Sequence, residues 1–330
     1  MNFTELSTFS VAHHELPWPW IAFAATGDRF AALAASQRVA TWTLADDQIV
    51  EGPSFALPAD FVAQGFAIEG TGTLLAAHDG KSVLTLDATG VVRRSTLADV
   101  LASAPSADAA IRCVAFDRRG TRVWVSADAA DASWLALVDA RTHASHGFVR
   151  SAAFVPPAVH ELFVHPTDDA VLLLAACGPD GTFARVAGFT DGPVVLVETA
   201  LDGGAVAAGF AGFSGDGALV FLAEADELRT HAWPGLQQLA SVDLADGFVS
   251  SFTGVVRGGV VLVDGVDDES GDDAVMQFDR AGLVGARARP PIPPGMWAGA
   301  LGRDCLVTVD AKGEPATARV LRIGVLPATN

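Results

Sequence analysis

The apolar residues of this chain recur in short blocks that are separated by turn residues. The stretch FAGFSGDGALVFLAE, residues 210–224, shows the arrangement: an apolar run, a Ser-Gly-Asp-Gly turn and a second apolar run. Glycine tolerates the backbone angles of tight turns, and aspartate stabilises turns by hydrogen bonds to its own backbone. The pattern therefore predicts a β-hairpin at residues 210–224.

The same unit occurs seven times along the chain. Clear copies start at Phe23 (FAATGDRFAALAAS), Phe66 (FAIEGTGTLLAAHD), Val114 (VAFDRRGTRVWVSAD) and Phe163 (FVHPTDDAVLLLAAC), and weaker copies start at Thr253 and Gly299. The turns end at Asp28, Gly72, Gly120, Asp169, Gly217, Gly258 and Asp304. Neighbouring turn ends lie 41 to 49 residues apart. A period of this length with several short strands per unit is typical of a β-propeller.

Each unit predicts about four antiparallel strands. The apolar runs after the turns need cover on both faces, which stacked blades provide. We predict an all-β fold, a seven-bladed β-propeller, with residues 1–330 forming a single domain. The blades are expected to start near residues 19, 62, 110, 159, 207, 248 and 295. The last unit lacks an outer strand, so we expect an N-terminal strand at about residues 3–12 to pair into the seventh blade and close the ring.

The F-x-x-x-G-x-x-h-h-h unit, where h is an apolar residue, resembles the repeats of seven-bladed propellers of the WD40-like and YVTN-like superfamily. The resemblance covers essentially the whole chain, although the units lack the Gly-His and Trp-Asp dipeptides of true WD40 repeats. It implies a propeller fold, and the missing dipeptides put a WD40-type ligand pocket in doubt. Propellers carry many different functions, so the fold alone does not determine the function, and the residues of a binding or catalytic site must indicate it.

Charge and hydropathy narrow the range of partners. The 330 residues hold 39 acidic and 21 basic side chains, a net charge of −18. Phosphate backbones are repelled by such a chain, and the pairs Arg93-Arg94 and Arg118-Arg119 are too small to form a basic patch, so we expect no nucleic-acid partner. The mean hydropathy is +0.35, but no apolar run reaches the 18 residues of a membrane span, so we expect no membrane partner either.

The compartment is predicted to be the cytoplasm. The first residues, MNFTELSTFS, lack a basic segment followed by an apolar one, which a secretory signal has. Cys113, Cys177 and Cys305 lie far apart in or beside apolar runs, which favours reduced, buried thiols over disulfides. No phosphate-binding or dinucleotide-binding glycine motif is present, and we expect no cofactor.

The innermost strands hold the first set of candidate site residues. Counting eight residues back from each turn end gives Trp20, Gln64, Arg112, Glu161, Gly209, Ser250 and Met296. These positions are more polar than the next ones along, and alternate residues of a strand face opposite ways. We therefore expect Gln64, Arg112, Glu161 and Ser250 to point into the axial channel or its mouth. Two interpretations stay open: an Arg112–Glu161 ion pair in a water-filled channel, or a ligand site.

Three tryptophans are candidates for a binding face. Trp18 and Trp20 precede the first blade and Trp297 precedes the seventh, and these blades become neighbours when the ring closes. Clustered aromatic residues are common energetic centres of protein interfaces. Packing between blades explains them equally well.

Metal sites are not expected. The segment HELFVH, residues 160–165, places His160 and His165 five residues apart in a predicted strand, whereas a zinc-protease motif needs a separation of four on a helix. The acidic segment DDESGDD, Asp267 to Asp273, is attractive to calcium but lacks the spacing of an EF-hand loop. It is predicted to be a solvated hairpin tip.

The sequence favours a non-catalytic protein–protein interaction or scaffold module that docks a protein partner in a larger cytoplasmic complex. The alternative is a propeller-type hydrolase, lactonase or lyase, or a small-ligand sensor, with its site at the channel mouth. In the enzyme, Glu161 or His160 is the base and Arg112 stabilises a developing oxyanion.

Overall fold

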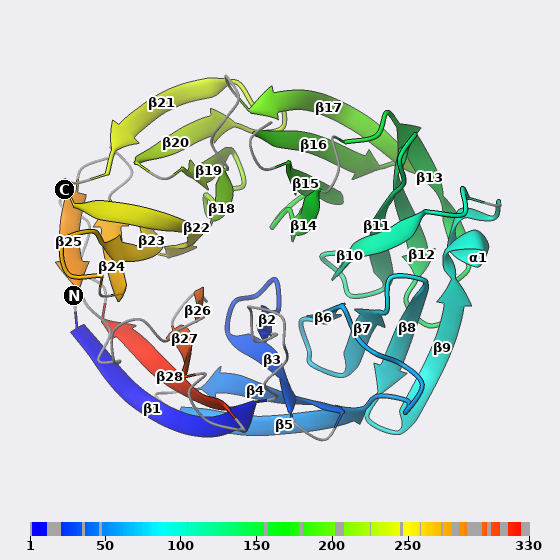
Figure 1. Cartoon of the computed structure of the whole chain (residues 1–330), viewed down its shortest axis with the longest axis horizontal. Helices are drawn as coiled ribbons and strands as arrows, with labels where there is room; N and C mark the ends of the chain where they lie inside the picture. Colours follow the sequence, from blue (N-terminus) through cyan, green and yellow to red (C-terminus); the bar gives the residue numbers. More distant parts are fainter. Residues whose placement is uncertain are drawn as a thin grey trace.

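The fold is a ring of seven four-stranded antiparallel sheets around a central axis (Figure 1). The computed structural model describes residues 2–11, 21–34, 37–45, 48–103, 105–154, 158–177, 181–201, 208–224, 226–244, 247–257, 259–271, 273–278, 284–288, 299–301, 305–310 and 316–324. The ring confirms the predicted all-β class, the seven blades and the four strands per blade.

Blades 1 to 4 follow one another along the chain, and within each of them the four strands run in chain order from the axis outward. Blade 1 holds β2 (Ile21–Phe23), β3 (Arg29–Ala34), β4 (Arg38–Ala45) and β5 (Gln48–Ala56). Blade 2 holds β6 (Gly65–Ile68), β7 (Leu74–His78), β8 (Ser82–Asp87) and β9 (Gly90–Thr96). Blade 3 holds β10 (Ala110–Phe116), β11 (Arg122–Asp128), β12 (Ser133–Asp139) and β13 (Ser145–Ser151). Blade 4 holds β14 (Val159–Val164), β15 (Ala170–Ala176), β16 (Thr182–Phe189) and β17 (Pro193–Leu201).

The last three blades complete the ring. Blade 5 holds β18 (Gly209–Phe213), β19 (Leu219–Ala223), β20 (Glu227–Ala232) and β21 (Gln238–Asp243). Blade 6 holds β22 (Phe248–Arg257), β23 (Val260–Asp267), β24 (Asp273–Phe278) and β25 (Val284–Ala288). Blade 7 holds β26 (Gly299–Leu301), β27 (Cys305–Asp310), β28 (Ala316–Gly324) and, as its outermost strand, β1 (Asn2–Val11).

The hydrophobic core lies between the blades. Middle strands such as β7 and β12 are buried along nearly their whole length, because each blade packs between two others. Outer strands alternate buried and exposed residues, as β17 does. A buried cluster joins each pair of neighbouring blades, including blades 7 and 1. Continuous apolar runs in the sequence therefore mark the middle strands.

The ring closes as predicted, through the N-terminal strand. β1 pairs antiparallel with β28 from Asn2 to Val11, with one irregularity between Glu5 and Ser7. The ring of Phe9 on β1 stacks on Trp42 of blade 1, with ring centroids 4.0 Å apart. The first and last segments of the chain thus join blade 7 to blade 1 by backbone pairing and by aromatic packing.

A tight turn follows the innermost strand of each clearly repeated blade. Gly72, Gly120 and Gly217 have φ of 74°, 69° and 74°, which confirms them as turn positions. In blade 1 the residue with positive φ is Gly27, one residue before the predicted Asp28, and in blade 6 Gly259 has positive φ. Each innermost strand begins at one face of the ring and ends at the other, and these turns lie on the face where the strands end.

The turn glycines also receive a side chain from the preceding blade. A Cβ at Gly120 would overlap Cγ of Glu69, and a Cβ at Gly217 would overlap the ring of His165. Glu69 and His165 are the first residues after β6 and β14, and both are buried. The ring nitrogen Nε2 of His165 also lies 2.8 Å from the carbonyl oxygen of Gly217. The turns therefore need glycine for backbone angle and for space.

A short helix between blades 2 and 3 was not predicted. α1 (Leu97–Leu101) begins after Thr96, whose side chain accepts a hydrogen bond from the Asp99 backbone while the Asp99 carboxylate accepts one from the Thr96 backbone. Its apolar residues join the cluster between blades 2 and 3. The helix covers part of that junction.

We predict that Gly120→Ala destabilises the fold more than Gly271→Ala. Both glycines have nearly the same φ, 69° and 68°, but a Cβ at Gly271 meets nothing within 4 Å. Positive φ alone costs an L-residue about 1 kcal/mol, and overlap with Glu69 adds about 1 to 3 kcal/mol. Urea unfolding followed by circular dichroism measures both losses. Equal losses would show that the contact with Glu69 is unimportant.

Candidate functional site

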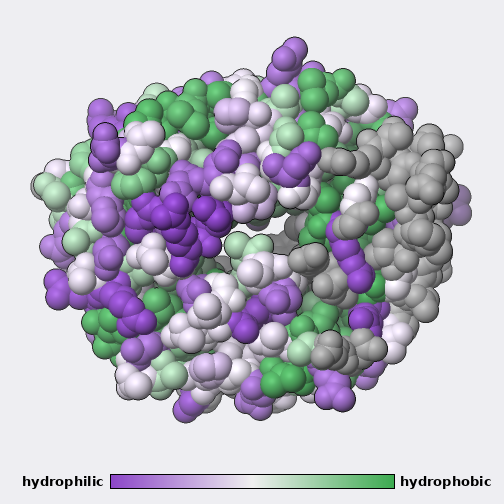
Figure 2. Space-filling view, turned by 180° about the vertical axis from the view of Figure 1, so that it is seen from behind, coloured by the Kyte–Doolittle hydropathy of each residue, from purple (hydrophilic) through white to green (hydrophobic). Residues whose placement is uncertain are grey.

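The mouth of the axial channel is formed where the innermost strands begin. Gln64, just before β6, Arg112 on β10 and Glu161 on β14 are all exposed. β10 packs beside both β6 and β14, so these three residues lie on adjacent blades. Figure 2 shows that the ring is open at its centre. An accessible channel edged by polar residues is the first feature of the candidate site.

Three exposed valines mark the same entrance. Val62 precedes β6, Val159 begins β14 and Val249 is the second residue of β22, and they are 59%, 67% and 41% exposed. Val62 and Val159 lie ten residues before the predicted turn ends of their blades, and Val249 lies nine residues before that of blade 6. Sequence analysis missed them because it compared only the positions eight and seven residues before the turn. Trp18 stands ten residues before Asp28, at the corresponding sequence position of blade 1.

Arg112 does not pair with Glu161, which corrects one interpretation of the sequence. Its Nε donates a hydrogen bond to Oδ1 of Asp128, at the end of β11 in its own blade. Arg112 is an extra residue in the pairing of β10 with β11, between Ile111 and Cys113. Such a bulge changes the direction of a side chain. The guanidinium therefore turns toward its own blade rather than toward blade 4.

Glu161 is a carboxyl group without an ion pair among the described residues. The residue is exposed overall, but neighbouring atoms shield its carboxyl group from part of the solvent, and this desolvation raises its pKa. The same surroundings act on Cys113 on β10. Burial, and secondarily the charge of Glu161, raises the pKa of that thiol to about 12. Cys113 is thus a protonated, unreactive thiol at neutral pH.

His160 forms a buried link between blades 3 and 4. Its Nδ1 lies 2.6 Å from Oγ of Ser126 on β11, and its Nε2 lies 3.5 Å from Oδ2 of Asp128. The residue types match a serine hydrolase triad, but the side chain of His160 is 0% exposed and Ser126 is 0% exposed. A substrate cannot reach this serine in the structure. The group joins two blades and orients Asp128 toward Arg112.

Burial determines the protonation state of His160. Desolvation lowers its pKa to about 3, and the positive charges of Arg112 and Arg185 act in the same direction. The imidazole is therefore neutral at pH 7. It cannot act as a general base for a substrate because it has no access to the channel.

The other predicted site residues are placed differently. Ser250 on β22 was expected to point into the channel or its mouth. It is buried instead, with 3% exposure. Two extra residues, Ser251 and Phe252, interrupt the pairing of β22 with β23 directly after it and change the alternation. Trp18, Trp20 and Trp297 lie outside the described residues, and so does Met296.

The two histidines of the HELFVH segment do not meet. His160 contacts Ser126, whereas His165 follows the strand and contacts the turn of blade 5. In the described ranges, no group of three His, Cys, Asp or Glu side chains is close enough to hold a metal ion. Asp267, in the acidic segment, accepts hydrogen bonds from the backbones of Glu269 and Ser270 and so stabilises its own turn.

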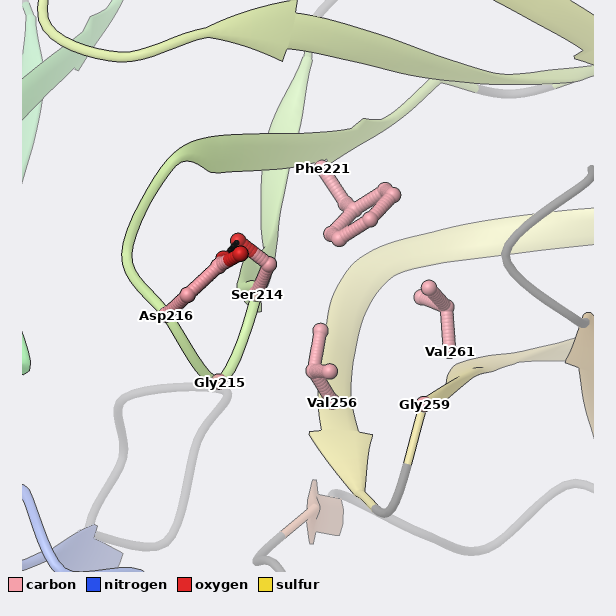
Figure 3. A pocket seen from close by; sticks show the side chains of 7 residues that line it. All are labelled: Ser214, Gly215, Asp216, Phe221, Val256, Gly259 and Val261. Carbon is pink, nitrogen blue, oxygen red and sulfur yellow. Dashed lines mark hydrogen bonds between the residues drawn. The ribbon is translucent and has the colours of Figure 1, made fainter.

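A second hollow lies at the opposite end of the ring, between blades 5 and 6. It has a volume of about 180 Å³. In Figure 3 the side chains of Phe221, Val256 and Val261 point into it, and the turn Ser214-Gly215-Asp216 forms one edge. The hollow thus combines apolar walls with a polar rim.

Comparison with known proteins supports the fold and leaves the function open. No protein-family model and no curated protein sequence matches the chain. Solved structures that match include the β-propeller domain of Cps50 (Swd1) from Myceliophteria thermophila, with a TM-score of 0.62 and 12% identity over 98% of this chain and 100% of that one. The chain has the fold of a WD40-like seven-bladed propeller. At this identity, the likeness shows the fold alone.

We predict that the neutral His160 makes the protein less stable as the pH is lowered below 6.5. In the unfolded chain a histidine binds a proton below its ordinary pKa of about 6.5, whereas folded His160 stays neutral until about pH 3. Its contribution is complete above pH 6.5 and is lost progressively as the pH falls from 6.5 toward 3, because the unfolded state binds more protons. One such group lowers the free energy of unfolding by about 2 kcal/mol between pH 7 and pH 5.

Urea unfolding of wild type and His160→Gln at the two pH values measures this contribution. Glutamine cannot be protonated, so the variant should lose about 2 kcal/mol less between pH 7 and pH 5 than wild type does. The ring proton shifts of His160 in NMR spectra should stay constant from pH 8 to pH 5. A titration of this ring near pH 6.5 would contradict the prediction.

Proposed function

We propose that this propeller is a non-catalytic protein-interaction module that docks a protein partner on the channel mouth. The supporting observation is the group of exposed valines, Val62, Val159 and Val249, near the starts of the innermost strands of three blades. Single exposed apolar residues are common on protein surfaces, but their repetition around one opening is typical of a binding surface. Apolar contacts edged by polar groups are the usual composition of an interface.

The polar residues of the mouth would give the interface its specificity. Arg112 is held by Asp128 through Nε only, and its terminal amino groups make no hydrogen bond among the described residues. Glu161 has a raised pKa and accepts a hydrogen bond at little cost when a partner buries it. A partner segment that offers an apolar side chain to the valines and a hydrogen-bond acceptor to Arg112 fits this surface.

The setting of the module is also part of the proposal. We propose that residues 1–330 act as one domain, in a larger cytoplasmic complex. Cys113, Cys177 and Cys305 are free thiols, as expected in a reducing compartment. The net charge of −18 favours a basic or neutral protein partner over nucleic acid or an acidic membrane surface. No helix in the described parts of the chain is long and apolar enough to cross a membrane.

A small-ligand role at the same mouth is the second candidate, and the raised pKa of Glu161 is the observation that favours it. Desolvation raises the pKa of this carboxyl group, so it takes up a proton more readily than a solvated glutamate does and is better suited to donate a hydrogen bond to a bound ligand. His160 cannot serve as the base of an enzyme at this mouth, because its side chain is buried. Arg112 and Glu161 remain as the groups that a small ligand would contact.

We predict that Val62→Asp/Val159→Asp/Val249→Asp prevents capture of the partner. The tagged propeller is used to recover proteins from a lysate of the native source, and the recovered proteins are identified by mass spectrometry. The matched control is Val50→Asp/Val91→Asp/Leu239→Asp, which changes three similarly exposed residues on the outer strands β5, β9 and β21. Unchanged thermal unfolding shows that both variants are folded.

A partner that is recovered with wild type and control but not with the mouth variant supports docking at the mouth. Calorimetry with the purified partner should then show one-to-one binding and a loss of at least about tenfold in affinity, or 1.4 kcal/mol, for the mouth variant. Equal binding by all three proteins would refute the mouth as the docking surface. Binding of a metabolite that depends on Arg112 and Glu161, with no protein partner, would favour the second candidate.

A further inference from the structure

The junction between blades 5 and 6 lacks a side chain that two other junctions have. Between blades 2 and 3, Glu69 occupies the space beside Gly120, and between blades 4 and 5, His165 occupies the space beside Gly217. The corresponding residue after β18 is Ser214. In blade 6 the pairing of β22 with β23 continues to Arg257 and Val260, so Gly259 lies in a shorter turn than Gly120 and Gly217, and a Cβ there would meet nothing within 4 Å. The hollow of about 180 Å³ in Figure 3 lies at this junction.

Ser214 cannot fill the hollow because it is short and its hydroxyl group is engaged locally. Its Oγ accepts a hydrogen bond from the backbone of Leu219 at 2.9 Å and donates one to Oδ1 of Asp216 at 2.6 Å. Asp216 also accepts a hydrogen bond from the backbone of Ala218. The turn is therefore fixed while the side chain of Ser214 stays within its own hairpin.

The lining defines the kind of group that fits. Phe221, Val256 and Val261 form apolar walls, and the exposed Asp216 places a carboxylate at the rim. An arginine side chain has a matching form, because its methylene stem packs on apolar surface while its guanidinium stays near water and pairs with a carboxylate. The volume corresponds to one side chain rather than to a larger ligand.

We propose that this hollow, the blade 5–6 pocket, accepts an arginine side chain of a basic protein partner. The net charge of −18 attracts a basic partner and disfavours an acidic one. The inference rests on the proposed function in that the chain binds a protein, but it does not depend on the channel mouth, which lies at the other end of the innermost strands. The partner would then contact a second surface of the ring.

The first test uses a short peptide as the probe. Acetyl-Gly-Gly-Arg-Gly-Gly-amide is titrated into the isotope-labelled full chain, and the backbone amide signals are followed by NMR. We expect saturable shifts at Gly215, Asp216 and Gly259 in the millimolar range. The same peptide with citrulline, which has nearly the same shape and no charge, should bind at least about tenfold more weakly because the pairing with Asp216 is lost. Equal binding of both peptides would overturn the proposal.

Two variants locate the binding. Ser214→Glu should fill the pocket as Glu69 fills the junction of blades 2 and 3, and it should abolish the shift at Gly259. Asp216→Asn keeps the size and an acceptor oxygen but removes the charge, so it should weaken the arginine peptide at least about fivefold and leave the citrulline peptide unchanged. Asp226→Asn is the matched control, since it removes one exposed charge of the same blade at the opposite end. If Ser214→Glu does not fold, the comparison of Asp216→Asn with Asp226→Asn still tests whether the arginine side chain binds in the blade 5–6 pocket.

The variant at the channel mouth separates this proposal from the proposed function. Val62→Asp/Val159→Asp/Val249→Asp should keep the peptide shifts at Gly215 and Gly259, because these residues lie at the other end of the ring. Loss of partner capture with intact peptide binding would support both surfaces. Peptide shifts confined to the channel mouth, or shifts that Asp216→Asn and Asp226→Asn reduce equally, would overturn the blade 5–6 pocket and leave the mouth untouched.

Discussion

The ring depends on the need of every middle strand to be covered on two faces. A strand such as β8, buried along nearly its whole length, is stable only between two neighbouring blades, and seven blades satisfy this condition only when the ring is closed. Closure rests on β1, which pairs with β28 and stacks Phe9 on Trp42. Disruption of this contact would expose apolar faces of blades 7 and 1 together. The closing strand therefore supports all the other junctions, including both candidate sites.

The repeat made most of the fold predictable from the sequence. Turn glycines such as Gly72 and Gly120 need positive φ, and apolar runs of strand length follow the turns, so the repeat is visible even in blade 4, whose turn holds aspartates in place of glycine. The missing strand of the last unit indicated closure by the N-terminal segment for the same reason. Helix α1 escaped prediction because it is only five residues long and is held by a local cap and by packing against its neighbours. A period of 41 to 49 residues carries no information about such an insertion.

The candidate site was predictable only in part, because strict alternation does not hold at the starts of the innermost strands. Gln64 and Glu161 are exposed as expected, but a bulge at Arg112 directs its guanidinium to Asp128 of the same blade. A larger irregularity follows Ser250, which is buried. Bulges are common where a strand changes its course, and no residue pattern in one sequence announces them. The exposed valines precede the positions that the sequence pattern compared, and they do not lie at one fixed distance from the predicted turn ends, so the repeat alone does not mark them.

A repeated fold acquires individual sites where its units differ. The residue after the innermost strand is Glu69 in blade 2, His165 in blade 4 and Ser214 in blade 5, and each caps its own turn by a hydrogen bond to the backbone. The long side chains also fill the space beside the next blade, whereas serine satisfies the turn and leaves that space open. One shortened side chain thus preserves the local structure of the hairpin while it creates a pocket between blades. The same reasoning applies at the channel mouth, where exposed valines stand near the starts of the innermost strands of blades 2, 4 and 6.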